Sequence, residues 1–240
     1  MLKTSLFFLY ILVFTASCQE TPSVKNTTIA IDAAPKVPNI PYGEMKLKVD
    51  DLRQKLNKEY HQAAHKNAFL DSTSNVFTTF LLDSIIPYWY GTPWTFTGHT
   101  DTPNEGEVAC GYLVSTSLRH MGLSLNRFRM AQQASKLAVQ TIALSADNVT
   151  FMSNVSLPDI ANMDVGLYVV GLDNHVGFIL RKPDETLFIH SDYVSGGVIR
   201  QCIEDAPAFR SQVYYFGKIS GNRLLMKKWL IGEKVKVVMQ

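Results

Sequence analysis

The order of two hydrophobic patterns constrains this chain more than any other feature. Apolar residues recur at helical spacing in the first part, and from Gly166 onward short apolar segments alternate with turn residues. Helices are expected over 46–67, 74–86, 110–122 and 127–143, and strands over 166–172, 176–180, 186–190, 198–202, 213–220 and 234–239. Helices followed by consecutive strands are typical of an α+β domain with an antiparallel sheet. With 240 residues, 46% of them hydrophobic and 18% charged, the chain can build one sizeable core.

The first residues have the pattern of an export signal. Met1-Leu2-Lys3 precedes an apolar run over 6–14, and small residues then lead directly to Cys18. A basic start, a short apolar segment and small residues before a break are typical of a secretory signal. The end on Cys18 resembles the lipobox of bacterial lipoproteins, in which this cysteine is lipidated. We therefore expect a bacterial envelope protein that a lipid on Cys18 anchors to a membrane.

The chain is expected to have four parts. The signal covers 1–17 and a flexible tether covers 18–45, because that segment is rich in Thr, Pro, Asn and Ala. An N-terminal helical segment covers 46–87, and the remaining residues, 88–240, form the main domain. The net charge of +2 gives no reason to expect nucleic acid as a partner. No Gly-rich phosphate loop or Cys-x-x-Cys pair is present, so neither a cofactor nor a metal is expected.

Cys110 is expected in the first turn of a helix. The preceding residues 102–106 read Thr-Pro-Asn-Glu-Gly and predict a loop, whereas the apolar residues after Cys110 form one helical stripe. Free backbone N–H groups and the helix dipole at such a position favour the thiolate over the thiol. Gly111 is expected to leave the approach to the sulfur open. A cysteine of this kind is a candidate nucleophile, although most free cysteines are small buried hydrophobic residues.

A predicted hairpin brings two histidines together. The segment 181–185 reads Arg-Lys-Pro-Asp-Glu and predicts a turn between two strands. If Lys182 pairs with Glu185, His190 lies opposite Gly177 and Asp192 lies opposite His175. His175, Gly177, His190 and Asp192 then share one face of the hairpin, and His190 is the diagonal neighbour of His175. This register predicts a polar pair that can act as a base and its orienting partner.

Three blocks of the sequence resemble the NlpC-type cell-wall peptidases, which are papain-like cysteine enzymes. The first block, 90–98, is rich in aromatic residues and glycine, and the second is Ala109-Cys110-Gly111-Tyr112-Leu113-Val114. The third block consists of Asn174-His175-Val176-Gly177-Phe178-Ile179, then Phe188-Ile189-His190-Ser191, then Gly197-Val198-Ile199. The resemblance covers roughly residues 88–200. The family usually has Asp-Cys-Ser-Gly around its nucleophile, whereas this chain has Ala-Cys-Gly-Tyr.

The resemblance implies a papain-like fold, with helices that include the nucleophile helix packed on an antiparallel sheet. It implies a thiol-dependent amide hydrolase that acts on peptidoglycan stem peptides. Cys110 would be the nucleophile, His175 the general base and His190 the residue that orients His175, with Asp192 as the alternative for that third role. Asn104 is a candidate oxyanion donor or a turn residue, and Trp94 is a candidate wall of the cleft. Two alternatives stay open: a papain-like acyltransferase or amidase with a substrate outside the cell wall, and an inactive envelope lipoprotein that binds peptides.

The lipidation hypothesis predicts the behaviour of Cys18→Ser in a bacterial host. The wild-type protein should fractionate with membranes and carry a lipid on Cys18, whereas the variant should be released or left unprocessed because it has no thiol to modify. Cell fractionation and mass spectrometry of the N-terminal peptide measure both properties. Equal membrane retention of the two forms without a lipid adduct would contradict the hypothesis.

Overall fold

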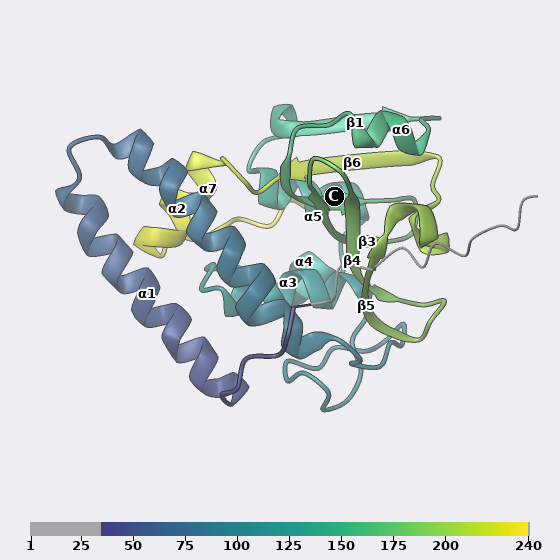
Figure 1. Ribbon diagram of the computed structural model, residues 1–240, viewed down its shortest axis with the longest axis horizontal. Helices are drawn as coiled ribbons and strands as arrows, with labels where there is room; N and C mark the ends of the chain where they lie inside the picture. Colours follow the sequence, from purple (N-terminus) through teal and green to yellow (C-terminus); the bar gives the residue numbers. More distant parts are fainter. Residues whose placement is uncertain (1–34, 240) are drawn as a thin grey trace, which may run out of the picture. The chain divides into compact units, whose positions relative to one another are not determined.

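One antiparallel sheet is the centre of the fold. The computed structural model describes residues 35–239, and its six strands follow the order β1-β6-β2-β3-β4-β5 (Figure 1). The strands are β1 (Val149–Ser153), β2 (Gly166–Gly171), β3 (Val176–Arg181), β4 (Thr186–Asp192), β5 (Gly197–Cys202) and β6 (Val213–Lys218). The predicted α+β class with an antiparallel sheet is therefore confirmed.

Seven α-helices accompany the sheet in the described part of the chain. They are α1 (Tyr42–Gln62), α2 (Lys66–Phe80), α3 (Cys110–His120), α4 (Arg127–Ala131), α5 (Ser135–Ala143), α6 (Leu157–Ala161) and α7 (Arg223–Ile231). The chain leaves α2 through one π-helical turn over Leu81–Ile85 and a 3₁₀ turn over Ile86–Trp89. Pro87 stands at the start of that 3₁₀ turn, where its missing N–H is not needed.

Several element boundaries differ from the prediction. The first predicted helix divides at residues 63–65, where Ala63 is extended and the Lys66 side chain donates to the carbonyls of Tyr60 and His61. The helix expected over 127–143 is two helices, α4 and α5, separated by residues 132–134. Strand β1 and helix α7 were not predicted, and the strand expected over 234–239 was wrong. That last segment instead packs in an extended form, with the N–H of Val238 bonded to Thr141 Oγ1 at 3.0 Å.

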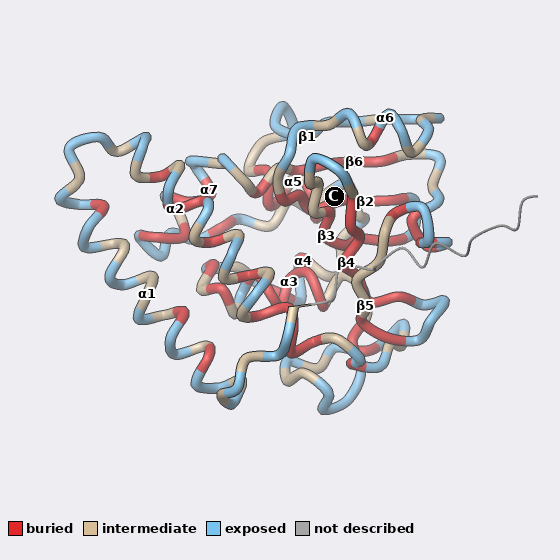
Figure 2. Tube along the Cα trace, viewed as in Figure 1, coloured by how far each residue is buried: buried red, intermediate tan, exposed pale blue. Residues whose placement is uncertain are grey.

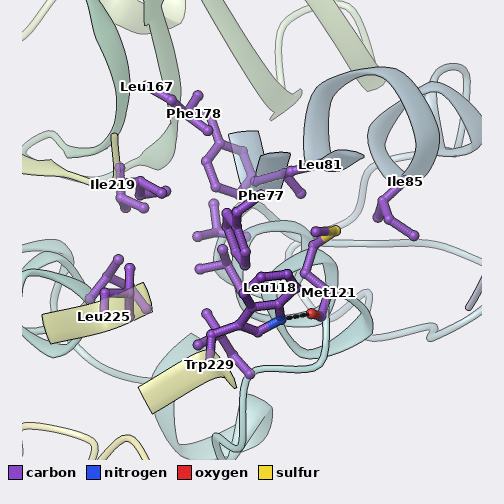
Figure 3. Packing of buried hydrophobic residues seen from close by; sticks show 14 of the residues in the cluster. Phe77, Leu81, Ile85, Leu118, Met121, Leu167, Phe178, Ile219, Leu225 and Trp229 are labelled. Carbon is purple, nitrogen blue, oxygen red and sulfur yellow. Dashed lines mark hydrogen bonds between the residues drawn. The ribbon is translucent and has the colours of Figure 1, made fainter. Parts of the chain in front are cut away.

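The main hydrophobic core lies on the side of the sheet that faces α3 and α5. Figure 3 shows Phe77 and Leu81 from the α2 region, Leu118 from α3 and Phe178 from β3 in this core. Trp229 of α7 closes it against Phe77 and donates its indole N–H to the Met121 carbonyl. Helices α1 and α2 contribute buried residues to the same cluster as the sheet. The described residues thus belong to one compact unit.

A second cluster covers the opposite face of the sheet. Phe188 and Ile179 lie there, together with Phe209 from the segment that follows β5. Because both faces are covered, strands β3 and β4 are buried over most of their length (Figure 2). Polar residues on these two strands are therefore removed from bulk water.

The loop after Trp89 runs along the outer edge of β5. Gly91 N–H donates to Val198 O at 3.0 Å, Val198 N–H to Thr92 O at 2.9 Å, and Trp94 N–H to Gly196 O at 2.9 Å. These bonds cover an edge that would otherwise be open, and they place the aromatic block beside the β4–β5 turn. Among the described residues, no helix combines the length and the apolar character needed to cross a membrane.

The hydroxyl of Tyr42 connects α1 to α3. It accepts a hydrogen bond from Trp89 Nε1 at 2.9 Å and donates one to His120 Nδ1 at 2.8 Å. Burial lowers the pKa of His120 to about 4, so the imidazole is neutral at pH 7, and Nδ1 accepts from Tyr42 in the tautomer that carries its proton on Nε2. This network joins the N-terminal helix to the end of the cysteine helix.

We expect Tyr42→Phe to lower the free energy of unfolding by about 1–3 kcal/mol, because Trp89 Nε1 and His120 lose their partner in a desolvated place. Urea unfolding followed by fluorescence measures the change. Tyr60→Phe is the matched control, because Tyr60 is also a buried tyrosine of α1 and its contact with the Lys66 ammonium is made by its backbone carbonyl, which the substitution keeps. Equal effects of both substitutions would contradict the role of the network.

Candidate functional site

The β3–β4 hairpin has the register that the turn sequence predicted. Lys182 N–H donates to Glu185 O at 2.8 Å, and Phe178 pairs with Ile189. The same register places His190 opposite Gly177. Nε2 of His175, just before β3, lies 2.8 Å from Nδ1 of His190 in β4. The expected contact between the two imidazoles is confirmed.

Both imidazoles are desolvated. His175 is 4% exposed and His190 is fully buried. The Phe188 ring stacks on His190 with centroids 3.9 Å apart, and its edge meets His175. Burial lowers the pKa of His175 to about 4, and burial together with the neighbouring His175 also lowers the pKa of His190. The pair is therefore neutral at pH 7, so one imidazole donates to the other.

Gly177 makes room for this arrangement. A side chain built there would place its Cβ 2.5 Å from the Phe188 ring and 3.0 Å from His190 Cβ. Real Cβ atoms do not approach so closely. The glycine is thus required for the packing of the aromatic and imidazole rings on this face.

Cys110 is the first residue of α3, as predicted. The nearby backbone N–H groups of Val176, Gly111 and Cys110 itself act to lower the pKa of the thiol. Burial nevertheless outweighs their effect and raises the pKa of the thiol. The expectation that the helix start favours a thiolate was therefore wrong for the resting protein, and Cys110 is a neutral thiol at pH 7.

Gly111 does not leave the sulfur open. A Cβ at this position would lie 2.6 Å from the carbonyl oxygen of Ala131. The missing side chain lets α4 pack against the start of α3, so the space beside Gly111 is occupied by Ala131 rather than open. Cys110 itself remains partly exposed.

The thiol and the histidine pair meet at the beginning of β3. The sulfur lies near the backbone N–H of Val176, which belongs to the peptide bond between His175 and Val176. Val176 and Phe178 pack with α3, whereas Gly177 and Ile179 alternate to the side of Phe188 and the histidine pair. Among the described residues, no hydrogen bond joins the Cys110 sulfur to an imidazole. The structure thus brings the predicted nucleophile and base to adjacent chain segments without a direct bond.

Asp192 has a structural task in the β4–β5 turn. Its carboxylate accepts the N–H groups of Val194 at 3.0 Å and Ser195 at 2.9 Å. Burial alone would raise the pKa of this carboxyl, but these hydrogen bonds lower it on balance. Among the described residues, Asp192 has no hydrogen bond to His175, whose Nε2 contacts His190 instead.

Asn104 and Trp94, the two residues predicted for the cleft, have different roles in the structure. Asn104 adopts a left-handed backbone with φ of 59°, and its Nδ2 donates to Tyr88 O at 2.9 Å. It is a turn residue that holds the aromatic loop, and the Tyr88 carbonyl takes one of its amide N–H groups. Trp94 contacts Tyr193, with ring centroids 6.1 Å apart, and Tyr193 in turn packs against His175 at 5.5 Å. Trp94 thus belongs to an aromatic series that leads to the histidine pair.

Three residues near the site were not predicted. Gln201 of β5 places Nε2 3.1 Å from Nε2 of His190, and Tyr193 lies on His175 while remaining 49% exposed. Ser191, on the opposite face of β4, donates to Val108 O at 2.6 Å and fixes the segment before Cys110. A predicted register between β4 and β5 would have placed Gln201 diagonally from His190. The sequence of the turn between these two strands, however, does not determine which residues pair.

Cys202 takes no part in this site. Cys202 is a free thiol in β5 whose pKa is raised by burial and by Glu185, Glu204 and Asp205. Cys18 lies outside the described residues. Within residues 35–239 no group of three or more His, Cys, Asp or Glu side chains could hold a metal ion.

Comparisons of the chain with protein-family models, curated proteins and solved structures found no match. Any functional conclusion therefore has to come from the chemistry of the residues described above.

The desolvated histidine pair predicts acid destabilisation. In the unfolded chain these residues take up protons below about pH 6.5, whereas folded His175 stays neutral down to about pH 4. The unfolded state then binds more protons, so the free energy of unfolding falls as the pH is lowered from about 6.5 to about 4, by at most about 1.4 kcal/mol per pH unit for each histidine.

Urea unfolding at pH 7 and pH 5 measures this dependence, and His190→Asn should make it shallower. His61→Asn, on the exposed surface of α1, is the control and should leave the dependence unchanged. An identical dependence in wild type and His190→Asn would contradict the neutral buried pair.

Proposed function

We propose that this protein is a thiol-dependent amide hydrolase in which Cys110 is the nucleophile and His175 is the general base. The observation that carries the proposal has two parts. The Cys110 thiol at the start of α3 lies beside the peptide bond between His175 and Val176, and His175 forms a buried, hydrogen-bonded pair with His190. A nucleophile at a helix start, a base, and a third group that orients the base are the parts that thiol catalysis needs.

The resting site holds its proton on sulfur. His175 uses Nε2 for the contact with His190, so Nδ1 is the nitrogen left to accept the thiol proton. Because the thiol pKa is raised and that of His175 is lowered, a neutral pair is more stable than an ion pair. Proton transfer then accompanies attack on the substrate, and the proposed mechanism requires Nδ1 to reach the sulfur in the substrate complex.

The reaction balances with water as the only co-reactant. As the Cys110 S–H proton moves to His175 Nδ1, sulfur bonds to the amide carbonyl carbon and the carbonyl oxygen becomes an oxyanion. The N–H groups at the start of α3 stabilise this charge. Collapse breaks the C–N bond, and the leaving amine takes the proton from His175. Water, deprotonated by His175, then cleaves the thioester, which releases the acid and restores the thiol.

Peptidoglycan stem peptides are the proposed substrate class. The resemblance of the nucleophile, base and aromatic blocks to NlpC-type peptidases supports this choice, as does the expected export signal. The aromatic series from Trp94 through Tyr193 to His175 offers an apolar wall along which a peptide can lie.

We expect Cys110→Ala and His175→Ala to abolish digestion of purified peptidoglycan, with a loss of about 10²–10⁴-fold or more for the base. His190→Ala should retain part of the activity, because it orients the base without reacting. Mass spectrometry of the released peptides identifies the broken bond.

Cys202→Ala is the matched control and should keep the wild-type rate, because its sulfur lies on the edge strand β5 and takes no part in the steps above. Activity that survives in Cys110→Ala would refute the proposal. If the wild type binds peptidoglycan but releases no product from it or from simple amides, the protein is a binding protein instead.

A further inference from the structure

The histidine pair continues into β5 through Gln201. Three groups form one series, with His175 Nε2 2.8 Å from His190 Nδ1 and His190 Nε2 3.1 Å from Gln201 Nε2. The pairing of Phe188 with Gln201 places the amide diagonally beside His190 on the same face. Gln201 is partly buried and lies within β5, one residue before its end, where the pairing of Phe188 with Gln201 gives its side chain a defined direction.

The orientation of this amide determines where the protons of both imidazoles are. When Nε2 of Gln201 faces His190, it can only donate, so His190 Nε2 accepts and His190 Nδ1 carries a proton. That proton is donated to His175 Nε2, and neutral His175 must then carry its own proton on Nδ1. In this arrangement Nδ1 has no lone pair and cannot accept the proton of Cys110.

A rotation of 180° about the last side-chain torsion of Gln201 reverses the direction of both hydrogen bonds in the series. The amide oxygen then faces His190 and accepts its Nε2 proton, while His190 Nδ1 accepts the Nε2 proton of His175. Nδ1 of His175 is now free to act as the base. After proton transfer the His175 imidazolium keeps its donation to His190, so no hydrogen bond has to be broken.

The structure has the amide nitrogen of Gln201 toward His190. We propose that Gln201 is the positioning residue that selects the base-competent proton arrangement by turning its amide oxygen to His190. The inference rests on the proposed hydrolase function, because it specifies how His175 becomes a base. Few other groups can take this role: the charged or titratable groups that act on His190 are His175 and Asp192, and Asp192 is engaged by Val194 and Ser195.

The test measures tautomers directly. In protein labelled with ¹⁵N in histidine, long-range ¹H–¹⁵N spectra at pH 7 distinguish Nδ1–H from Nε2–H imidazoles, and His175→Gln and His190→Gln assign the signals. We expect both residues to carry the proton on Nε2 in the wild type. Gln201→Leu removes the acceptor and should move population toward Nδ1–H, whereas Gln201→Glu, a carboxylate that only accepts, should keep both protons on Nε2.

Kinetics give a second readout. Gln201→Leu should lower kcat by about ten-fold or more with little change in KM, since a wrong tautomer of the base costs up to ~10⁴-fold in triads. Gln201→Glu should restore most of this loss and move the acid limb of the pH profile to higher pH, because a carboxylate stabilises a protonated His190. Gln140→Leu, on α5, is the matched control for loss of a partly buried glutamine amide and should change neither measurement.

The outcomes separate the two proposals. A His175 Nδ1–H signal as the main wild-type form, or unchanged tautomers in Gln201→Leu, would overturn the role of Gln201 even if Cys110 and His175 are essential. Full activity of Cys110→Ala would refute the hydrolase, while the spectra still decide whether Gln201 sets the proton positions.

Discussion

The register of the β3–β4 hairpin is the constraint on which the rest of the site depends. Lys182 and Glu185 close the turn, so every later pair in the two strands is determined. A shift by one residue would place His190 on the α3 side and separate it from His175. It would also move the Phe188 ring away from Gly177, which has no side chain to collide with it. The chemistry of the histidine pair is thus a consequence of a two-residue turn on the surface.

Desolvation keeps the two histidines and the Cys110 thiol neutral, and the neutral histidines lower the stability of the fold in acid. A buried imidazole without charge binds no proton at a pH where the unfolded chain does, so the histidine pair reduces stability in acid. The same burial makes His175 available as a proton acceptor near pH 7, because most of it is unprotonated. Burial also keeps the thiol of Cys110 protonated at pH 7. A neutral resting thiol is less exposed to oxidation than a thiolate.

The sequence predicted those parts of the site that follow from local rules. Strand alternation and a turn motif sufficed for the contact between His175 and His190, and helical periodicity sufficed for Cys110 at the start of α3. The parts that it missed depend on tertiary packing. Gly111 looked like an opening because its neighbour Ala131 comes from another helix, and the thiol pKa was misjudged because burial cannot be read from one helix. The division of 127–143 into α4 and α5 likewise has no proline or glycine to announce it.

The thiol and the histidine pair are held by different means. Cys110 is positioned by the packing of α3 on β3, while the imidazoles are fixed by Phe188 and by β4 and β5. The two parts adjoin at the peptide bond between His175 and Val176, where β3 begins. The backbone of His175 is itself fixed there, because its carbonyl accepts the N–H of Leu172 at 2.8 Å. The distance between the thiol and the imidazoles therefore depends on how α3 packs on the sheet, whereas the contact between the imidazoles depends on the register of the β3–β4 hairpin.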